Sequence, residues 1–336
     1  MTTLPFVIVD VFSTTAFKGN PLAIVNNTTT DLSTAQQQFI TRQFNLSETT
    51  FFSKPTLPKA AYKLRSFLPD GREVFGAGHN ILGVWWWLAV GGFLDLSKPT
   101  SRDGKSGSDE FVFWQELGGE VLPVKILRKQ TLGDGGTEIT VSIRQAPPKA
   151  QNVHPDPASL AQSIGLSPSD IGFGGTSVSL QPQVFSTSST RHLQVPISSI
   201  SALNRTSVQR DKLLHQLSLV DDHAYGLYLF SPVPDAKGSY QARFFSPGMS
   251  GEDPATGSAA GPLSAYLHRY GQLDLVEGVG RIAVTQGLSV GRECLINVTL
   301  SDTGAADGQV LDVDFSGSGV KVATGDITVP DAQLSF

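Results

Sequence analysis

The chain has 336 residues, 40% of them hydrophobic and 16% charged, which suits about two domains with a substantial core and excludes a disordered chain. Its net charge of −5 and sequence pI near 5.7 do not suggest non-specific binding to nucleic acid. The single cysteine, Cys294, excludes an intrachain disulfide framework and is compatible with a reducing compartment.

The N-terminus and the longest apolar stretch bear on localisation. The opening MTTLPFVIVDVF lacks a basic segment and contains Asp10, which is not the pattern of a secretory signal. The most apolar run, residues 81–94, is too short to span a bilayer and suits a buried helix. We therefore expect a cytoplasmic protein that does not bind membranes.

The first half alternates strand-like and helix-like segments. Hydrophobic and β-branched runs predict strands at 6–13, 18–25, 48–53, 61–69, 110–128 and 137–145, with a hairpin turn at 132–137. Helical spacing after an Asp or Ser cap predicts a helix over 31–46. Residues 78–92 are apolar on all sides and end in Gly-Gly, which predicts a fully buried helix. The Pro- and Gln-rich residues 146–157 are expected to form a linker.

The second half follows the same order of elements. Strands are predicted at 193–197, 224–231 and 240–248, with a helix at 207–219 and a second small, apolar helix at 256–271. Arg65, Phe67, Pro69 and Gly83 match Arg243, Phe245, Pro247 and Gly261 at one constant spacing of 178 residues. Together these features indicate a divergent duplication. We expect an α+β protein of two pseudo-symmetric domains, each a curved sheet around a central apolar helix, with residues 1–128 and about 322–336 in one domain and residues 129–321 in the other.

The polar residues that could carry chemistry gather where the two central helices are predicted to begin. Gly76, Gly78, His79 and Asn80 open the first helix, whereas Asp253, Thr256, Gly257 and Ser258 open the second. Free amides at helix N-termini bind carboxylates, and glycines let an anion approach the backbone. Two such ends in one cleft between the domains could hold a small carboxylic acid, while a carboxylate and an imidazole move its protons.

Glu48 is the further candidate, because it stands alone in NLSETTFF before a buried strand. Desolvation beside Phe51 and Phe52, together with the charge of Asp253, is expected to raise its pKa. A structural interpretation exists for each candidate: Glu48 caps a strand or pairs with an arginine, His79 is a core histidine, Asp253 caps a helix, and Ser258 is a packing residue.

Other classes of site receive no support. GAGHNILG has the wrong spacing for a dinucleotide-binding fingerprint, and the chain has no His-x-x-x-His or Cys-x-x-Cys pair for a metal. We therefore predict neither a cofactor nor a metal. The acids Glu116, Glu120, Asp221 and Asp222 are expected to be solvated.

Four separated motifs carry a resemblance to a known family. DVFSTTAFKGNPLAIV, NLSETTFF, AGHNILG and EDPATGSAAGPLSAYL together resemble the PhzF-like family of phenazine-biosynthesis isomerases, and the tail GSGVKVATGDITVP is similar to its final strands. The resemblance implies the diaminopimelate-epimerase fold, with an active site between two pseudo-symmetric domains, and a homodimer. The continuation of the GH motif as Asn80-Ile81 departs from the family pattern and affects the expected fit of the substrate.

The resemblance also implies roles for the candidate residues. Glu48 matches the family's general acid/base, while His79, Asp253 and Ser258 match residues that hold the substrate and assist proton movement. Gly78 and Gly257 match positions that donate backbone amides, and Asn80 and Thr256 lie beside them. A racemase with two thiols is excluded, because Cys294 is the only cysteine.

The expected function is a cofactor-independent isomerase in which a single glutamate moves a proton on a small carboxylic acid, cyclic unsaturated acids included. A lyase or cyclase that uses the same glutamate on a larger metabolite is an alternative. An alternative of another class is a non-catalytic protein that binds small acids.

Overall fold

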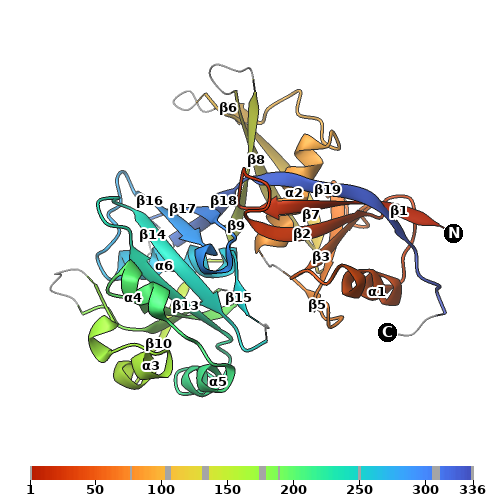
Figure 1. Cartoon of the computed structure of the whole chain (residues 1–336). Coiled ribbons are helices and arrows are strands. Elements are labelled where there is room, and N and C mark those ends of the chain that lie inside the picture. Colours follow the sequence, from red (N-terminus) through yellow and green to blue (C-terminus); the bar gives the residue numbers. More distant parts are fainter. Residues whose placement is uncertain are drawn as a thin grey trace. The chain divides into compact units, whose positions relative to one another are not determined.

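The computed structural model describes residues 2–75, 78–102, 107–130, 136–173, 179–187, 190–248, 251–304 and 311–333. The chain forms two compact units (Figure 1), and the first unites Met1–Ile143 with Ser316–Phe336, while the second is Arg144–Phe315. The sequence-based boundaries are 128/129 and 321/322. The first unit extends to Ile143 because the strand there still pairs with its neighbour through Lys125 and Ser142.

Unit 1 is a mixed sheet with two helices. Its strands are β1 (Thr3–Val11), β2 (Asn20–Asn26), β3 (Thr49–Ser53), β4 (Tyr62–Phe67), β5 (Glu73–Val74), β6 (Ser101–Arg102), β7 (Asp109–Leu117), β8 (Glu120–Gln130), most of β9 (Thr137–Gln145) and β19 (Gly319–Thr328). Its helices are α1 (Thr34–Phe44) and α2 (Gly78–Val90). The pairings run β19–β1–β2–β3–β4–β7–β8–β9, with β2–β3 and β4–β7 parallel.

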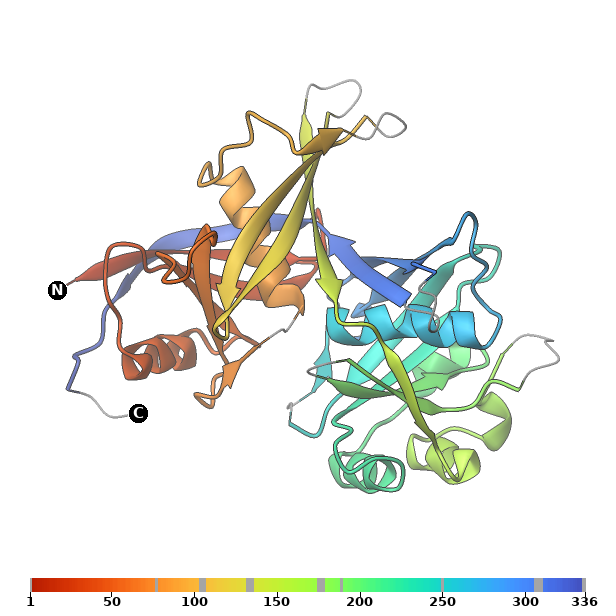
Figure 2. The ribbon, with the colours of Figure 1, turned by 180° about the vertical axis from the view of Figure 1, so that it is seen from behind.

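Helix α2 is the predicted central helix of this unit. It packs on β1, β2, β3, β8 and β19, and eleven of its thirteen residues are buried. Gly83 is required for close approach, because a Cβ there would lie 2.6 Å from Cγ2 of Val11. Figure 2 shows α2 against the strands of its unit from behind.

Unit 2 repeats this plan. Its strands are β10 (Lys149–Val153), β11 (Gln183–Ser186), β12 (Arg191–Pro196), β13 (Gly226–Pro232), β14 (Ser239–Phe245), β15 (Glu252–Asp253), β16 (Val279–Gln286), β17 (Cys294–Asp302) and most of β18 (Leu311–Gly317). Its α-helices are α3 (Pro157–Ser163), α4 (Ile200–Arg205), α5 (Arg210–Ser218) and α6 (Gly257–Arg269), with short 3-10 turns at Pro168–Asp170 and Leu288–Val290. The parallel pairs β12–β13 and β14–β16 correspond to β2–β3 and β4–β7.

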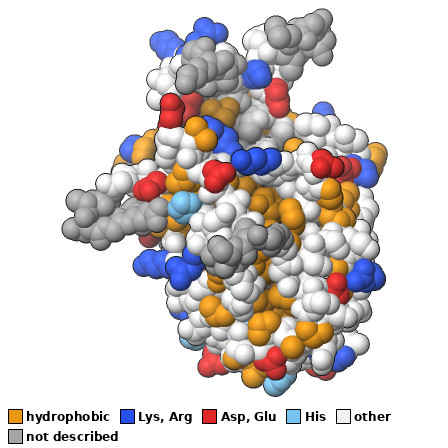
Figure 3. Space-filling model, turned by 90° about the vertical axis from the view of Figure 1, so that its left-hand side faces the viewer, with side chains coloured by type: hydrophobic (Ala, Val, Ile, Leu, Met, Phe, Trp, Pro, Cys, Tyr) orange, Lys and Arg blue, Asp and Glu red, His pale blue; other side chains and the backbone are white. Residues whose placement is uncertain are grey.

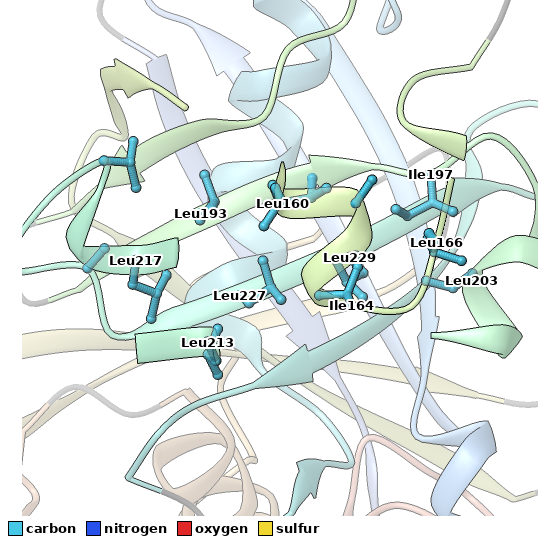
Figure 4. Close-up of a cluster of buried hydrophobic side chains, with 14 of the residues drawn as sticks. Leu160, Ile164, Leu166, Leu193, Ile197, Leu203, Leu213, Leu217, Leu227 and Leu229 are labelled. Carbon is cyan, nitrogen blue, oxygen red and sulfur yellow. The ribbon is translucent and has the colours of Figure 1, made fainter. Parts of the chain in front are cut away.

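The two faces of the unit 2 sheet are both covered. Helix α6 packs on β11, β12, β16 and β17, whereas α3, α4 and α5 contribute to a second core with β12 and β13. Figure 4 shows this second core, in which Leu160 of α3 and Leu217 of α5 lie against Leu193 of β12 and Leu227 of β13. Strands β12 and β13 are therefore buried on both faces, which explains their nearly continuous apolar sequences.

The duplication predicted from four identities is visible as a repeated ion pair. In unit 1 Arg65 bonds both carboxylate oxygens of Glu73 at 2.8 and 2.7 Å. In unit 2 Arg243 bonds Glu252 at 3.0 and 2.7 Å. Each guanidinium also lies 5.0 Å from the ring two residues later on its strand. These pairs fix β5 and β15, the short strands that lead into the two central helices.

Several local predictions differ from the structure. The expected linker over 146–157 contains β10, which pairs with β11, and the expected strand over 110–128 is two strands joined at Gly118 and Gly119, both with positive φ. Glu116 is buried, not solvated, because it accepts the backbone N–H groups of Thr56 and Leu57 at 2.5 and 2.9 Å. Of the hairpin turn predicted at 132–137, residues 132–135 lie outside the described residues.

The surface carries apolar patches. Figure 3 shows hydrophobic side chains gathered across the middle of one face, with charged side chains around them. Exposed large hydrophobic residues of unit 2 include Leu288, Val290 and Leu295. Within the described part of the chain, no helix is long and apolar enough to cross a membrane.

Candidate active site

The candidate site of unit 1 is a largely buried carboxylate beside an imidazole. Asn45 caps the end of helix α1 and turns the chain with its left-handed backbone, and Glu48 is the last residue before β3. His79 is the second residue of α2. Its Nε2 lies 3.3 Å from Oε2 of Glu48, and the two side chains are only 6% and 13% exposed. The acid is therefore paired with His79, and neither of the predicted structural roles, a strand cap or an arginine partner, describes this contact.

Burial raises the pKa of Glu48 from 4.5 to about 7. The rise confirms the expected direction and one expected cause, desolvation. The other expected cause, the charge of Asp253, concerns both units and stays a prediction. At neutral pH the protonated and ionised forms of a carboxyl with this pKa are both well populated, so the group can either donate or accept a proton.

The first turn of α2 has amides near this pair. Gly78, which the resemblance matches to a backbone donor position, begins the helix and is buried. Asn80 is also buried, and its Oδ1 accepts the N–H of Ile81 at 2.8 Å. The unusual Asn80 thus occupies one of the first-turn amides that would otherwise be open to an anion. Gly76 lies outside the described residues.

The half-site of unit 2 is a hydrogen-bonded cluster at the start of α6. Thr256, the N-cap residue, donates its hydroxyl to Oδ2 of Asp253 at 2.5 Å. Nε2 of Gln286 donates to the carbonyl of Asp253 at 2.8 Å and to Oγ1 of Thr256 at 3.0 Å. Asp253 and Thr256 are both buried. Asp253 is therefore held by the N-cap residue and is not itself the N-cap.

Two further groups of this cluster have no counterpart in the sequence-based prediction. Tyr228 is fully buried, and burial together with the charge of Asp253 raises the pKa of its hydroxyl. His192 is also fully buried, and its Nε2 lies 3.2 Å from Oγ of Ser258. Burial lowers the pKa of His192 to about 3, so the ring is neutral. Ser258 is thus a hydrogen-bonded residue as well as a small one.

Gly257 begins α6 and has a packing reason to be glycine. A Cβ at this position would lie 3.0 Å from Cε2 of Phe315. A larger side chain at this position would therefore press on this ring.

The described residues contain no group of three or more His, Cys, Asp or Glu side chains placed to hold a metal ion. Taken unit by unit, Glu48 and His79 of unit 1 are groups suited to proton transfer, and the amides and hydroxyls at the helix starts are suited to hydrogen bonding with an anion or hydroxyl.

Comparison with solved structures defines the class first. The fold is shared with a hydroxyproline epimerase from Agrobacterium vitis, with a TM-score of 0.60 at 10% identity over 97% of this chain and 91% of that chain. A PhzF-family protein from Bacillus anthracis gives a TM-score of 0.79 at 24% identity over 98% of this chain and all of that chain. The architecture is therefore the two-unit α+β fold of the epimerases and PhzF proteins.

Sequence comparison then gives the family. Residues 9–325 match the family described as phenazine biosynthesis-like protein, PhzC-PhzF. The trans-2,3-dihydro-3-hydroxyanthranilate isomerase of Pseudomonas chlororaphis is 30% identical over 96% of this chain and 99% of the relative. An uncharacterised isomerase of Mesorhizobium japonicum is 29% identical over 98% of this chain and the whole relative. The chain belongs to the PhzC-PhzF family and is an isomerase of that family.

Proposed function

We propose that this isomerase moves a proton on a small carboxylic acid and that Glu48 is its general acid/base. The observation that carries the proposal is the contact of buried Glu48 with His79, at 3.3 Å, together with a pKa of about 7. A carboxyl with this pKa can remove a proton from one carbon and return it to another within one catalytic cycle. The named relatives make trans-2,3-dihydro-3-hydroxyanthranilate the first substrate to test.

In this proposal both half-sites act on one substrate. Glu48 and His79 move the proton, while Asp253 and its partner Thr256 bind a polar group of the substrate. Ser258 and the amides of Gly78 and Gly257 hold the carboxylate, because first-turn amides and the positive helix end favour an anion. Asn80 restricts which acids can bind, because its Oδ1 already accepts the N–H of Ile81, which is then not open to the substrate.

The decisive experiment follows turnover in heavy water. Trans-2,3-dihydro-3-hydroxyanthranilate is incubated with the protein in D₂O, and NMR records both the isomer formed and the deuterium incorporated. Glu48→Gln should lower turnover by about a hundredfold or more, because the proton carrier is lost. Glu116→Gln is the matched control, since Glu116 is another glutamate of unit 1 with little exposure but contacts Thr56 and Lys63. Equal activity in the wild type and Glu48→Gln would remove Glu48 from the mechanism.

The same samples also show whether the protein binds a small acid without converting it. Calorimetry with 3-hydroxyanthranilate, an aromatic analogue of the test compound, measures affinity without requiring turnover. Tight binding without conversion of this or related acids would favour the non-catalytic alternative. Binding is expected to be unaffected by EDTA, because the proposed contacts are amides and side chains; loss of binding with EDTA would contradict the proposal.

We also propose that the chain forms a homodimer, as the family resemblance implies. Exposed hydrophobic side chains such as Leu288, Val290 and Leu295 provide apolar surface of the kind that interfaces cover. Sedimentation equilibrium should give twice the chain mass of 35.8 kDa, and a monomer at micromolar concentration would contradict this proposal.

A further inference from the structure

The strand registers identify the position in unit 2 that corresponds to Glu48. In unit 1 Thr49 of β3 pairs with Phe67 of β4, and in unit 2 Leu227 of β13 pairs with Phe245 of β14. The phenylalanines are the matched residues of the repeat. Glu48, which precedes Thr49, therefore corresponds to Gly226, which precedes Leu227.

The side chain that Gly226 lacks is replaced in space by the ring of His192. A Cβ on Gly226 would lie 2.5 Å from Nδ1 of His192 and 2.4 Å from the edge of Phe244. His192 reaches this point from the neighbouring strand β12, where it pairs with Gly226. The glycine is thus required by the imidazole, and both belong to one packed arrangement.

The partner of His192 also repeats the plan of unit 1. His79 is the second residue of α2 and contacts Glu48, whereas Ser258 is the second residue of α6 and contacts His192 at 3.2 Å. Each unit therefore places a polar side chain, from just before a strand in unit 1 and from within a strand in unit 2, against the second residue of its central helix. In unit 1 this group is Glu48, whose pKa is about 7, whereas in unit 2 it is His192, whose ring burial keeps uncharged.

The surroundings of His192 select one of its two neutral tautomers. Nδ1 is buried and has no hydrogen-bond partner among the described residues. An orphaned buried N–H is rarer in proteins than an acceptor without a partner, which favours the form with the proton on Nε2. That proton points to Oγ of Ser258, so the serine accepts it and its own hydroxyl proton is free to donate elsewhere.

We propose that His192 is a positioning residue that holds the hydroxyl of Ser258 as a hydrogen-bond donor toward the substrate. His192 is fully buried behind a half-buried serine, so it acts through Ser258 and does not itself touch the substrate. The inference rests on the proposed function of Ser258 in binding the substrate. It adds that the hydroxyl donates, which suits a carboxylate or another oxygen without a proton of its own.

The tautomer can be tested without any substrate. Two-bond nitrogen–proton NMR spectra distinguish the two neutral forms of an imidazole, and a His192→Leu sample identifies the signals of this ring. We expect protonated Nε2 and unprotonated Nδ1 between pH 5 and 8, with a changed Nε2 signal in Ser258→Ala. A ring protonated on Nδ1, or signals indifferent to Ser258→Ala, would overturn the inference while leaving the proposed isomerase function intact.

A double-mutant cycle tests the action through Ser258. Leucine is chosen for the variant His192→Leu because Leu22 is the residue of unit 1 that corresponds to His192. Ala23 pairs with Thr49 as Leu193 pairs with Leu227, and Leu22 and His192 are the residues immediately before them. This variant should lower kcat/KM for trans-2,3-dihydro-3-hydroxyanthranilate, and the affinity for 3-hydroxyanthranilate, by about fivefold, as expected for one neutral hydrogen bond. The same change in the Ser258→Ala background should have little further effect.

Two variants separate positioning from packing. His192→Gln keeps an N–H donor in place of Nε2 and should restore most of the lost affinity. His154→Leu removes another buried histidine of unit 2, whose ring accepts the N–H of Asp156 at 3.2 Å, and should affect stability without changing affinity. Equal losses from His192→Leu with and without Ser258, or no rescue by a folded Gln variant, would refute the role of His192. If the wild type neither converts nor binds the probes, the choice of substrate fails, and the NMR result alone decides the inference.

Discussion

The free energy of unfolding should depend on pH through Glu48 in a way that glutamine removes. Below about pH 4.5 the carboxyl is protonated in both the folded and unfolded chain, so it makes no difference to stability. As the pH rises toward 7, the unfolded carboxyl ionises while the folded one keeps its proton, because burial has raised its pKa to about 7. The wild type therefore loses stability over this interval, and the loss levels off above it.

The size of the effect follows from the pKa. A rise of about 2.5 in pKa corresponds to about 3 kcal/mol at 1.36 kcal/mol for each factor of ten. Glu48 is only 13% exposed, so solvent screening reduces this figure little. The free energy of unfolding of Glu48→Gln, minus that of the wild type, should thus increase by about 3 kcal/mol between pH 4 and pH 8.

Urea denaturation of the wild type and Glu48→Gln across this pH range measures the difference in free energy of unfolding. The pH dependence of every other titrating group is present in both proteins and cancels in the difference. Glu116→Gln provides a control of opposite sign. Hydrogen bonds from Thr56, Leu57 and Lys63 outweigh burial and lower the pKa of Glu116 to about 2. Its stabilising contribution is present above about pH 4.5 and is lost as the pH falls toward 2. A difference for Glu48→Gln that stays flat from pH 4 to pH 8 would refute the buried-acid interpretation.

Three other outcomes are expected. The kcat/KM of the enzyme should show an inflection near pH 7 that is absent from the residual activity of Glu48→Gln, measured in initial rates; an inflection below pH 5 would assign it to another group. Gly257→Val should lower the free energy of unfolding by about 1–3 kcal/mol, because the new side chain presses on Phe315, and it should weaken binding of 3-hydroxyanthranilate. Urea denaturation measures the first effect and calorimetry the second, and an unchanged stability and affinity would show that the ring moves aside. Glu116→Ala should cost about 2–4 kcal/mol at pH 7, because the amides of Thr56 and Leu57 lose their acceptor; a cost below 0.5 kcal/mol, in the range of ordinary surface substitutions, would show that the loop does not depend on Glu116.

The sequence was sufficient for the features that depend on local pattern. Helix α1 was predicted over 31–46 after an Asp or Ser cap, and it runs from Thr34 to Phe44 because Ser33 and Gln36 form a capping box and Asn45 closes the helix. The two central helices were predicted over 78–92 and 256–271 from their apolar composition, and the structure has them at Gly78–Val90 and Gly257–Arg269. Glu48 was found as a lone acid before a buried strand, although nothing in its surroundings along the chain indicated His79 as its partner.

The residues that were missed depend on strand register. His192 and Gln286 lie at the beginning and the end of apolar strands, where a polar residue gives no sign of its partner. The contact of His192 with Ser258 requires β12 to lie beside β13 with His192 opposite Gly226, and that alignment is set by the whole sheet. Glu116 was misjudged for the same reason, because the amides that bind it come from a loop about 60 residues earlier.

The pairing of β1 with β19 determines the order in which the two units can complete their folding during synthesis. Thr3 lies opposite Thr328, and the two strands stay paired through Val11 and Gly319. The ribosome therefore releases the whole of unit 2, which is one continuous segment, before unit 1 has its last strand. Until then β1 has a free edge and can pair with another chain. Premature termination after residue 315 should accordingly yield a product whose second unit can fold while its first remains open to aggregation.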